Sequence, residues 1–275
     1  MSTSLTVRSR VGASFATASE QERAALIGYL PAGFPSVDGG IALMQAMVAG
    51  GVDAMEIGFP YSDPVMDGPT IQRASEIALS GGMRTADVLR TVEAVARTGV
   101  PVLVMTYWNP VEHFGVDRFA ASLAAAGGAG LITPDLIPEE AQPWLDASDA
   151  HQLDRVFLVS PSSTDVRIRA AATASRGFLY ATSVMGVTGV RAQTSWQAPE
   201  LVARARTLTD VPIGVGLGVS DGRQAAEVAG FADAVIVGSA FVRCVLDASD
   251  ERGAADGVAA LAAELAGGVR RPHRP

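Results

Sequence analysis

A length of 275 residues, with 48% apolar and 18% charged residues, provides enough apolar material for a large buried core and argues against a disordered polar chain. The net charge of −8 argues against a nucleic-acid partner, because affinity for the phosphate backbone depends on a basic surface. Cys244 is the only cysteine, which excludes an intramolecular disulfide and a cysteine-based zinc site, and we expect a cytoplasmic protein.

The N-terminal segment precedes the first predicted strand. Residues 1–12 contain no apolar run typical of a signal peptide, and the chain has no uninterrupted apolar stretch of about 18 residues, as a membrane span requires. We therefore expect neither secretion nor membrane insertion. We expect an additional helix within Leu5–Ala25 that crosses the bottom of the fold, and a frayed tail at Arg270–Pro275.

Short β-branched or apolar runs then alternate with longer Ala-rich segments of helical spacing, which is the pattern of βα units around a parallel sheet. The eight predicted strands are Leu26–Leu30, Ala54–Gly58, Val102–Met105, Gly130–Thr133, Arg155–Val159, Gly177–Ala181, Pro212–Gly216 and Ala234–Gly238. The predicted helices lie near residues 37–50, 85–98, 116–127, 138–149, 164–175, 197–207, 221–229 and 253–267.

This alternation fits a closed barrel or an open, doubly wound sheet. The open sheet usually has about five or six strands and a Gly-rich first βα turn. The first turn here, Leu30–Pro35, lacks that pattern, and eight units favour closure. We therefore predict an α/β fold, a (β/α)8 TIM barrel that forms a single domain over residues 1–275. In such a barrel the active site lies at the C-terminal ends of the strands.

Glu56 lies near the C-terminal end of the second predicted strand. Strand side chains alternate, so Val52, Ala54 and Glu56 share a face, and Glu56 should point into the barrel mouth. Apolar surroundings should raise the pKa of its carboxyl group, so that it can both donate and accept a proton near neutral pH. A rim glutamate in a structural ion pair fits the pattern equally well.

Asp67 lies in the long polar loop, residues 60–70, that follows the same strand. Long loops at this end of a barrel often carry binding groups. Asp63-Pro64 and Asp67-Gly68 are also ordinary turn-forming pairs, and for either aspartate alone a role in a turn is the commoner one.

Glycines follow the last three predicted strands and predict a phosphate site. Their backbone N–H groups can approach an anion closely, and the loops after strands seven and eight often bind phosphate in these barrels. Each Gly motif alone is weak, but together they favour phosphate binding over simple loop formation. The motifs are Gly186-Val187-Thr188-Gly189, Gly216-Leu217-Gly218 and Gly238-Ser239.

The three histidines, His113, His151 and His273, have no spacing that would gather them around a metal ion, so we expect no metal site. A Ser-His-Asp relay is not expected either, because no Gly-x-Ser-x-Gly elbow is present.

The run from Met55 to Gln72, MEIGFPYSDPVMDGPTIQ, closely resembles the signature of the tryptophan synthase alpha subunit family. The resemblance covers nearly the whole chain except its two tails. It extends to Met105-Thr106-Tyr107-Trp108-Asn109-Pro110, to Asp135 after the fourth strand, and to the three Gly motifs.

The resemblance implies retro-aldol cleavage of indole-3-glycerol phosphate into indole and glyceraldehyde 3-phosphate. By its place in the motif, Glu56 would protonate indole C3 and help to remove the proton of the glycerol hydroxyl, and Asp67 would accept the indole N–H. The resemblance also implies a substrate-binding role for a further set of residues. They are Tyr29 and Tyr180 as walls of the indole pocket, Tyr107, and Thr188, Gly189, Gly218, Gly238 and Ser239.

The resemblance further implies a partner, a beta subunit, in an alpha2-beta2 complex. The partner would bind at the C-terminal face of the barrel, around Pro60, Asp63 and Asp135, receive indole directly, and carry pyridoxal phosphate. All 21 basic residues of this chain are Arg, which independently excludes a lysine-linked pyridoxal phosphate or a Schiff-base aldolase here. No cofactor is therefore expected on this chain.

Two departures and three rival functions accompany this interpretation. Val184 stands where some relatives carry Arg, and Tyr29 stands where relatives use Phe, so loop closure and pocket contacts can differ. A phosphate-binding barrel isomerase would need a Cys/Asp acid-base pair at the strand ends, and none is evident. A silent allosteric partner of a beta subunit and a stand-alone indole-producing lyase remain as alternatives.

Overall fold

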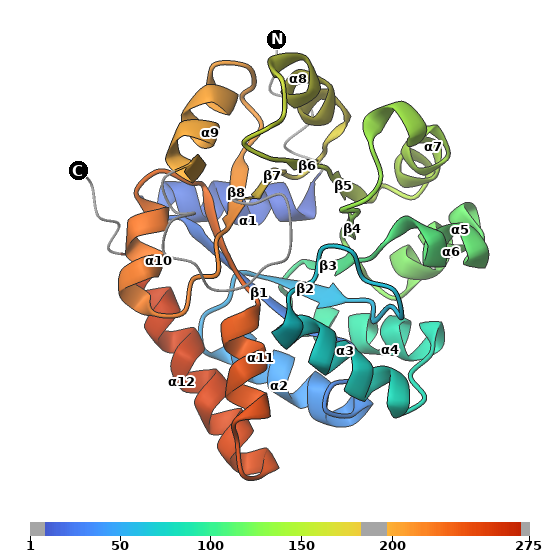
Figure 1. Cartoon of the computed structure of the whole chain (residues 1–275), viewed down its shortest axis with the longest axis vertical. Coiled ribbons are helices and arrows are strands. Elements are labelled where there is room, and N and C mark those ends of the chain that lie inside the picture. The colour runs from blue at the N-terminus through green and yellow to red at the C-terminus, as the bar shows by residue number, and fades with distance from the viewer. Residues whose placement is uncertain (1–8, 183–196, 271–275) are drawn as a thin grey trace.

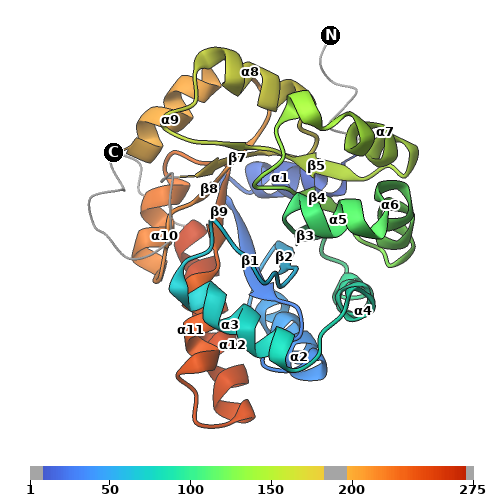
Figure 2. The ribbon, with the colours of Figure 1, turned by 45° about the vertical axis from the view of Figure 1, so that its right-hand side comes forward.

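The computed structural model describes residues 9–182 and 197–270, and within them nine parallel strands form one sheet surrounded by helices (Figures 1 and 2). The sheet order is β5-β4-β3-β2-β1-β9-β8-β7-β6. The strands are β1 (Ala25–Pro31), β2 (Ala54–Gly58), β3 (Val102–Met105), β4 (Gly130–Ile132), β5 (Asp154–Val156), β6 (Leu158–Val159), β7 (Leu179–Thr182), β8 (Ile213–Gly216) and β9 (Ala234–Val237).

The sheet closes into a barrel at Phe157. The two strands at the ends of the sheet, β5 and β6, are separated by this single residue, and they pair with β4 and β7 respectively. The carbonyl of Phe157 accepts a hydrogen bond from Tyr180 N at 3.0 Å, which ties the interruption to β7. The predicted (β/α)8 barrel is therefore confirmed, with one correction: the predicted strand Arg155–Val159 is two strands.

The predicted helices are present, with shifted ends. They are α1 (Arg10–Glu20), α2 (Val37–Ala49), α4 (Thr85–Ala96), α6 (Val116–Ala125), α7 (Gln142–Ala150), α8 (Asp165–Ala174), α9 (Gln197–Arg206), α10 (Gly222–Ala229) and α12 (Glu251–Val269). Residues 138–140, predicted as the start of a helix, form a separate 3-10 turn before α7. No helix in residues 9–182 and 197–270 is long and apolar enough to cross a membrane.

Three further helices were not predicted: α3 (Pro69–Ser80), α5 (Trp108–Phe114) and α11 (Ser239–Leu246). Helix α3 begins with Pro69, whose fixed φ and missing N–H suit the first helical position. It buries Ile71, Ala74, Ser75 and Ala78, which are spaced as one helix face. These helices occupy βα connections, so they position the loops that carry the site.

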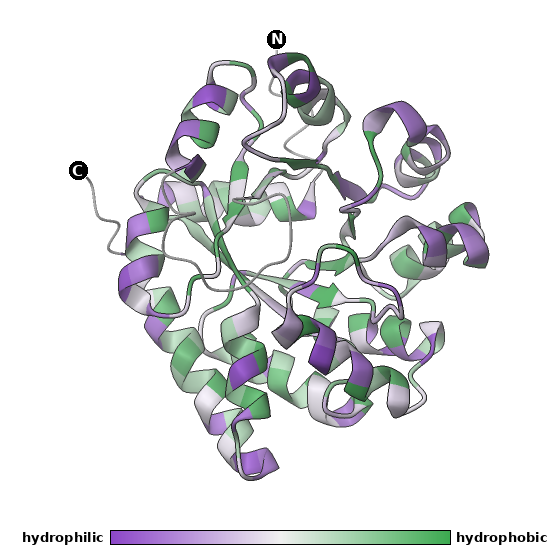
Figure 3. Ribbon diagram, in the orientation of Figure 1, coloured by the Kyte–Doolittle hydropathy of each residue, from purple (hydrophilic) through white to green (hydrophobic). Residues whose placement is uncertain are grey.

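Helix α1 closes the bottom of the barrel, as predicted for the N-terminal segment. Its Val11, Phe15 and Ala18 pack against the inward-facing strand residues, and the Phe15 ring stacks on Phe178 at 5.3 Å between centroids. Asp154 holds the start of α1, because its carboxylate accepts hydrogen bonds from Ser9 Oγ at 2.9 Å and Val11 N at 3.2 Å. In Figure 3 hydrophilic residues lie mainly on the helices, whereas the strands are mainly hydrophobic. With the bottom closed, the opposite end of the barrel is open to a substrate.

Candidate active site

Glu56 and Tyr29 lie side by side at the C-terminal ends of β2 and β1. They are directly paired in the parallel register, so their side chains point to the same side of the sheet. Alternation along β1 and β2 places them on the face of Ile27 and Ala54, which line the barrel interior. The prediction that Glu56 points into the barrel is confirmed.

The carboxyl group of Glu56 is buried and unpaired. Its exposed fraction is 1%, and Oε1 has no hydrogen-bond partner within the described residues 9–182 and 197–270. Burial raises the pKa of Glu56 from 4.5 to about 8, as expected for a carboxyl group whose charged form loses its hydration. Burial is the only cause of this shift, so the alternative of a structural ion pair gains no support. A protonated carboxyl group here can act as a general acid near neutral pH.

Asp67 is held in the mouth of the barrel by Tyr107. The Tyr107 hydroxyl accepts hydrogen bonds from Val65 N at 3.1 Å and Met66 N at 2.9 Å, which fixes the loop just before Asp67. Gln72 on α3 holds the other side, since its Nε2 donates to the Asp67 carbonyl at 2.8 Å. Burial raises the pKa of Asp67 to about 6, and the hydrogen bond to Tyr107 opposes that rise. Asp67 is therefore more than a turn residue, and it ionises at a lower pH than Glu56.

Glycines on neighbouring strands make room for two tyrosines in the mouth. A Cβ atom on Gly58 would overlap with the Tyr29 hydroxyl, and one on Gly238 would lie 3.2 Å from the Tyr29 ring. A Cβ atom on Gly216 would lie 2.5 Å from the Tyr180 hydroxyl. Both tyrosines are buried, with their rings against bare backbone. Tyr29, Tyr180 and Tyr107 thus gather around the two carboxyl groups. Burial raises the pKa of Tyr29 and Tyr180, and the negative charges of Asp67 and Glu56 raise that of Tyr29 further, as the charge of Glu56 does for Tyr180.

We expect Gly58→Ala to lower kcat/KM by ~10-fold or more, because the added methyl group displaces the Tyr29 ring and small displacements in a site are costly. The ring has little room to move, since Gly238 borders its other side. Gly267→Ala on α12 is the matched control, because a Cβ atom there meets nothing within 4 Å and Ala favours a helix. Equal kinetics for the two variants would contradict the argument.

The structure describes three of the predicted phosphate-binding residues, Gly218, Gly238 and Ser239. Gly238 is the N-cap of α11 and Ser239 its first residue, so the free N–H groups of that helix start and its dipole point toward the mouth. Gly218 lies in the β8–α10 loop with a φ of +70° and an open approach, a conformation that favours glycine. These features suit an anion. Thr188, Gly189 and Val184 lie outside the described residues.

The residues predicted to contact a partner lie on the same face. Asp63 and Asp135 are exposed, whereas Pro60 is buried and offers little surface of its own. The Asp135 carboxylate accepts Trp108 N at 2.9 and 3.1 Å, so it also caps the start of α5. Gln72 and Gly58 are the positioning residues that sequence reasoning missed, although the Pro69 helix start would have placed Gln72 on α3 next to Asp67.

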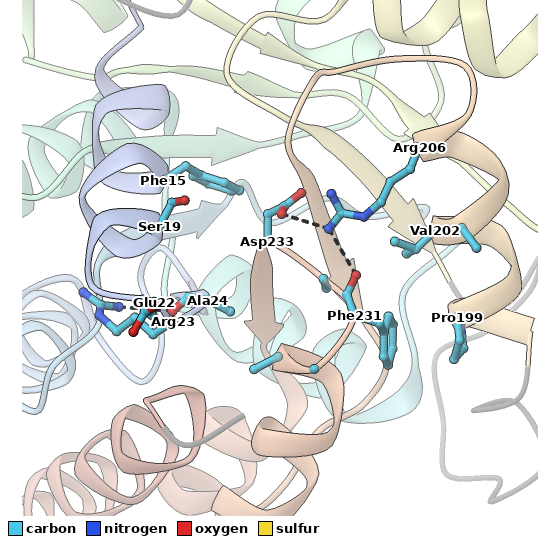
Figure 4. A pocket seen from close by; sticks show the side chains of 14 residues that line it. Phe15, Ser19, Glu22, Arg23, Ala24, Pro199, Val202, Arg206, Phe231 and Asp233 are labelled. Carbon is cyan, nitrogen blue, oxygen red and sulfur yellow. Dashed lines mark hydrogen bonds and ion pairs between the residues drawn. The ribbon is translucent and has the colours of Figure 1, made fainter. Parts of the chain in front are cut away.

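A cavity of about 640 Å³ lies at the opposite end of the barrel, beside α1 (Figure 4). Phe15 and Phe231 line it, and Arg206 there forms an ion pair with Asp233 at 2.9 Å. This ion pair neutralises both groups, whereas Glu56 Oε1 in the mouth has no hydrogen-bond partner among the described residues. Residues 9–182 and 197–270 contain no group of three or more His, Cys, Asp or Glu that could hold a metal ion. The barrel mouth is therefore the candidate active site.

Comparisons with known proteins match nearly the whole chain. A family model described as tryptophan synthase alpha chain matches residues 15–270. Proteins of that name from Acidothermus cellulolyticus and Salinispora arenicola are 64% and 63% identical, over 95% and 96% of this chain and 97% and 99% of their own. A tryptophan synthase structure from Mycobacterium tuberculosis has a TM-score of 0.89 at 56% identity, covering 95% of this chain and 98% of its own. A tryptophan synthase subunit alpha from Legionella pneumophila has a TM-score of 0.85 at 31% identity, covering 95% of this chain and 98% of its own.

Proposed function

Because the chain belongs to the tryptophan synthase alpha chain family, we propose that it is a carbon–carbon lyase that cleaves indole-3-glycerol phosphate into indole and glyceraldehyde 3-phosphate. The observation that carries the proposal is the pair of carboxyl groups in the barrel mouth. Glu56, with a pKa of about 8, is protonated at neutral pH, and Asp67, with a pKa of about 6, is ionised. The site thus supplies an acid and an anion at the same pH.

Glu56 acts on the bond that breaks. Its carboxylic acid donates a proton to indole C3, which leaves a positive charge on the ring nitrogen. The Glu56 carboxylate then takes the proton of the glycerol hydroxyl next to C3. The electron pair of the C–C bond passes into the indole ring, the hydroxyl-bearing carbon becomes the aldehyde, and Glu56 regains its proton. One group therefore serves both proton transfers, and no net proton is consumed.

Asp67 stabilises the charged intermediate. Its carboxylate accepts the indole N–H, and the negative charge is fixed where the positive charge develops on the ring. The position of this carboxylate depends on Tyr107 and Gln72, which hold the loop on both sides. Electrostatic stabilisation of this kind is strong in a site from which water is largely excluded.

Substrate binding uses the aromatic and backbone groups around the two carboxyl groups. Tyr29 and Tyr180 form walls for the indole ring. The N–H groups at Gly218, Gly238 and Ser239 bind the phosphate, as the start of α11 suits an anion. Thr188 and Gly189 are proposed to complete the phosphate site.

We propose a beta subunit as the partner, in an alpha2-beta2 complex. Asp63 and Asp135 are exposed beside the barrel mouth, so a partner bound there would receive indole at its exit. Pyridoxal phosphate would belong to that partner, because this chain has no lysine to hold it.

The test is the stoichiometry of the products. We expect the wild-type chain to release indole and glyceraldehyde 3-phosphate in equal amounts from indole-3-glycerol phosphate, with faster release when a beta subunit is added. Complex formation without cleavage would instead show an allosteric partner that has lost activity. Full turnover without any beta subunit would show a stand-alone lyase.

A further inference from the structure

The ring of Tyr29 alone would suffice as a wall of an indole pocket, so its hydroxyl group is available for a further role. The ring lies between Gly238, after β9, and Gly58 on β2, and its hydroxyl end lies over Gly58. Gly58 and Glu56 share the inner face of β2, since they are two residues apart. The phenol of β1 therefore places its polar end on the strand that carries Glu56.

The groups around this hydroxyl are acidic or neutral. Four groups act on it electrostatically: Asp67 in the loop after β2, Glu56 on β2, Tyr107 after β3 and Tyr180 on β7. Burial and the first two of these groups raise the pKa of Tyr29 well above 10, so the hydroxyl stays protonated and remains a donor. Within residues 9–182 and 197–270, Glu56 Oε1 is buried and has no hydrogen-bond partner.

The proposed reaction creates a need for such a donor. When Glu56 has given its proton to indole C3, a carboxylate remains in a buried place, where an unpaired charge is costly. Among the phenols near Glu56, Tyr29 is its direct strand neighbour, whereas the Tyr180 hydroxyl lies against Gly216 on β8. The Tyr29 hydroxyl therefore lies against the strand that carries Glu56, whereas that of Tyr180 does not.

We propose that Tyr29 is a positioning residue whose hydroxyl donates a hydrogen bond to the Glu56 carboxylate in the charged intermediate. The hydroxyl proton is not transferred. The hydrogen bond stabilises the carboxylate and aims it at the glycerol hydroxyl, whose proton Glu56 then takes. This inference rests on the proposed lyase function, and it assigns the hydroxyl of Tyr29 a role distinct from that of its ring.

The test compares Tyr29→Phe with the wild type, each in complex with a beta subunit. Phe keeps the ring and removes only the donor. We expect kcat to fall about ten- to hundredfold, as for the loss of a hydrogen bond to a charged group, with KM changed little. The alkaline limb of the pH profile should move to higher pH, because the ionised form of Glu56 loses a donor.

Tyr61→Phe is the matched control, because it also removes one phenol hydroxyl. That hydroxyl accepts a hydrogen bond from Asn109 Nδ2 at 3.1 Å, so its loss should leave kcat and the pH profile unchanged. A readout without turnover is the infrared band of the Glu56 carboxylic acid, assigned by difference from Glu56→Gln, which should titrate at higher pH in Tyr29→Phe. An unchanged kcat and band in an active enzyme, or a change in KM alone, would overturn the proposal. An inactive wild type would instead overturn the lyase function.

Discussion

Replacing Glu56 with Gln is expected to lower kcat/KM for cleavage of indole-3-glycerol phosphate by about 10²–10⁴-fold, the range for loss of a general acid-base group. Gln has nearly the same shape, but it can neither protonate indole C3 nor remove the proton of the glycerol hydroxyl. The measurement is indole release with and without a beta subunit. Glu76→Gln on α3, whose side chain is 65% exposed, is the control and should retain full activity.

Stability separates this loss of chemistry from a loss of folding. Burial raises the pKa of Glu56 from 4.5 to about 8 in the folded chain, so the folded state holds this proton more tightly than the unfolded state. The free energy of unfolding of the wild type therefore decreases as pH rises from 4.5 through about 8. Glu56→Gln lacks this decrease and should be at least as stable as the wild type at pH 8. Retention of cleavage within tenfold would rule out Glu56 as the acid.

Replacing Asp67 with Asn is expected to lower kcat by about 10²–10³-fold, because it removes the charge that stabilises the protonated indole ring. The Asn carbonyl can still accept the indole N–H, so KM should change less than kcat. The Tyr107 hydroxyl still accepts Val65 N and Met66 N in this variant, and the loop should keep its place. Steady-state kinetics of indole release measure both constants.

Asp256→Asn is the control for the Asp67 variant, since Asp256 lies on α12 with a side chain that is 78% exposed. It should behave as the wild type. A pure KM effect for Asp67→Asn would mean that the carboxylate binds substrate without stabilising the charged intermediate, and the proposed division of roles would then be wrong.

The barrel could be predicted from the sequence because its signals are local. Side chains alternate along a strand, so the order of residues in β2 is enough to place Ala54 and Glu56 on its inner face. The interruption at Phe157 could not be predicted, because the run Arg155–Val159 has no Gly or Pro to mark it. Helix α3 was missed because Asp67-Gly68-Pro69 fits a turn, although Pro69 also suits a helix start.

The site could be predicted only in part, because its decisive contacts join distant segments. Alternation left two roles open for Glu56, an acid-base group and a partner in a structural ion pair. The choice between them depends on which side chains the closed barrel brings near Glu56. Tyr29 and Tyr180 come close to Glu56 only because β1 and β7 face the same interior. The hold of Tyr107 on Val65 and Met66 likewise joins two different loops. No local pattern contains that information.

The pH dependence of kcat/KM for wild-type cleavage tests the central claim most directly, because it reports the ionisation of both carboxyl groups in the free enzyme. Activity requires ionised Asp67, with a pKa of about 6, and protonated Glu56, with a pKa of about 8. We predict a bell-shaped profile that falls below about pH 6 and above about pH 8, with the acid limb lost in Asp67→Asn. A rate that keeps rising through pH 9, well beyond the range of the Glu56 pKa of about 8, would contradict a protonated Glu56 as the acid that starts the cleavage.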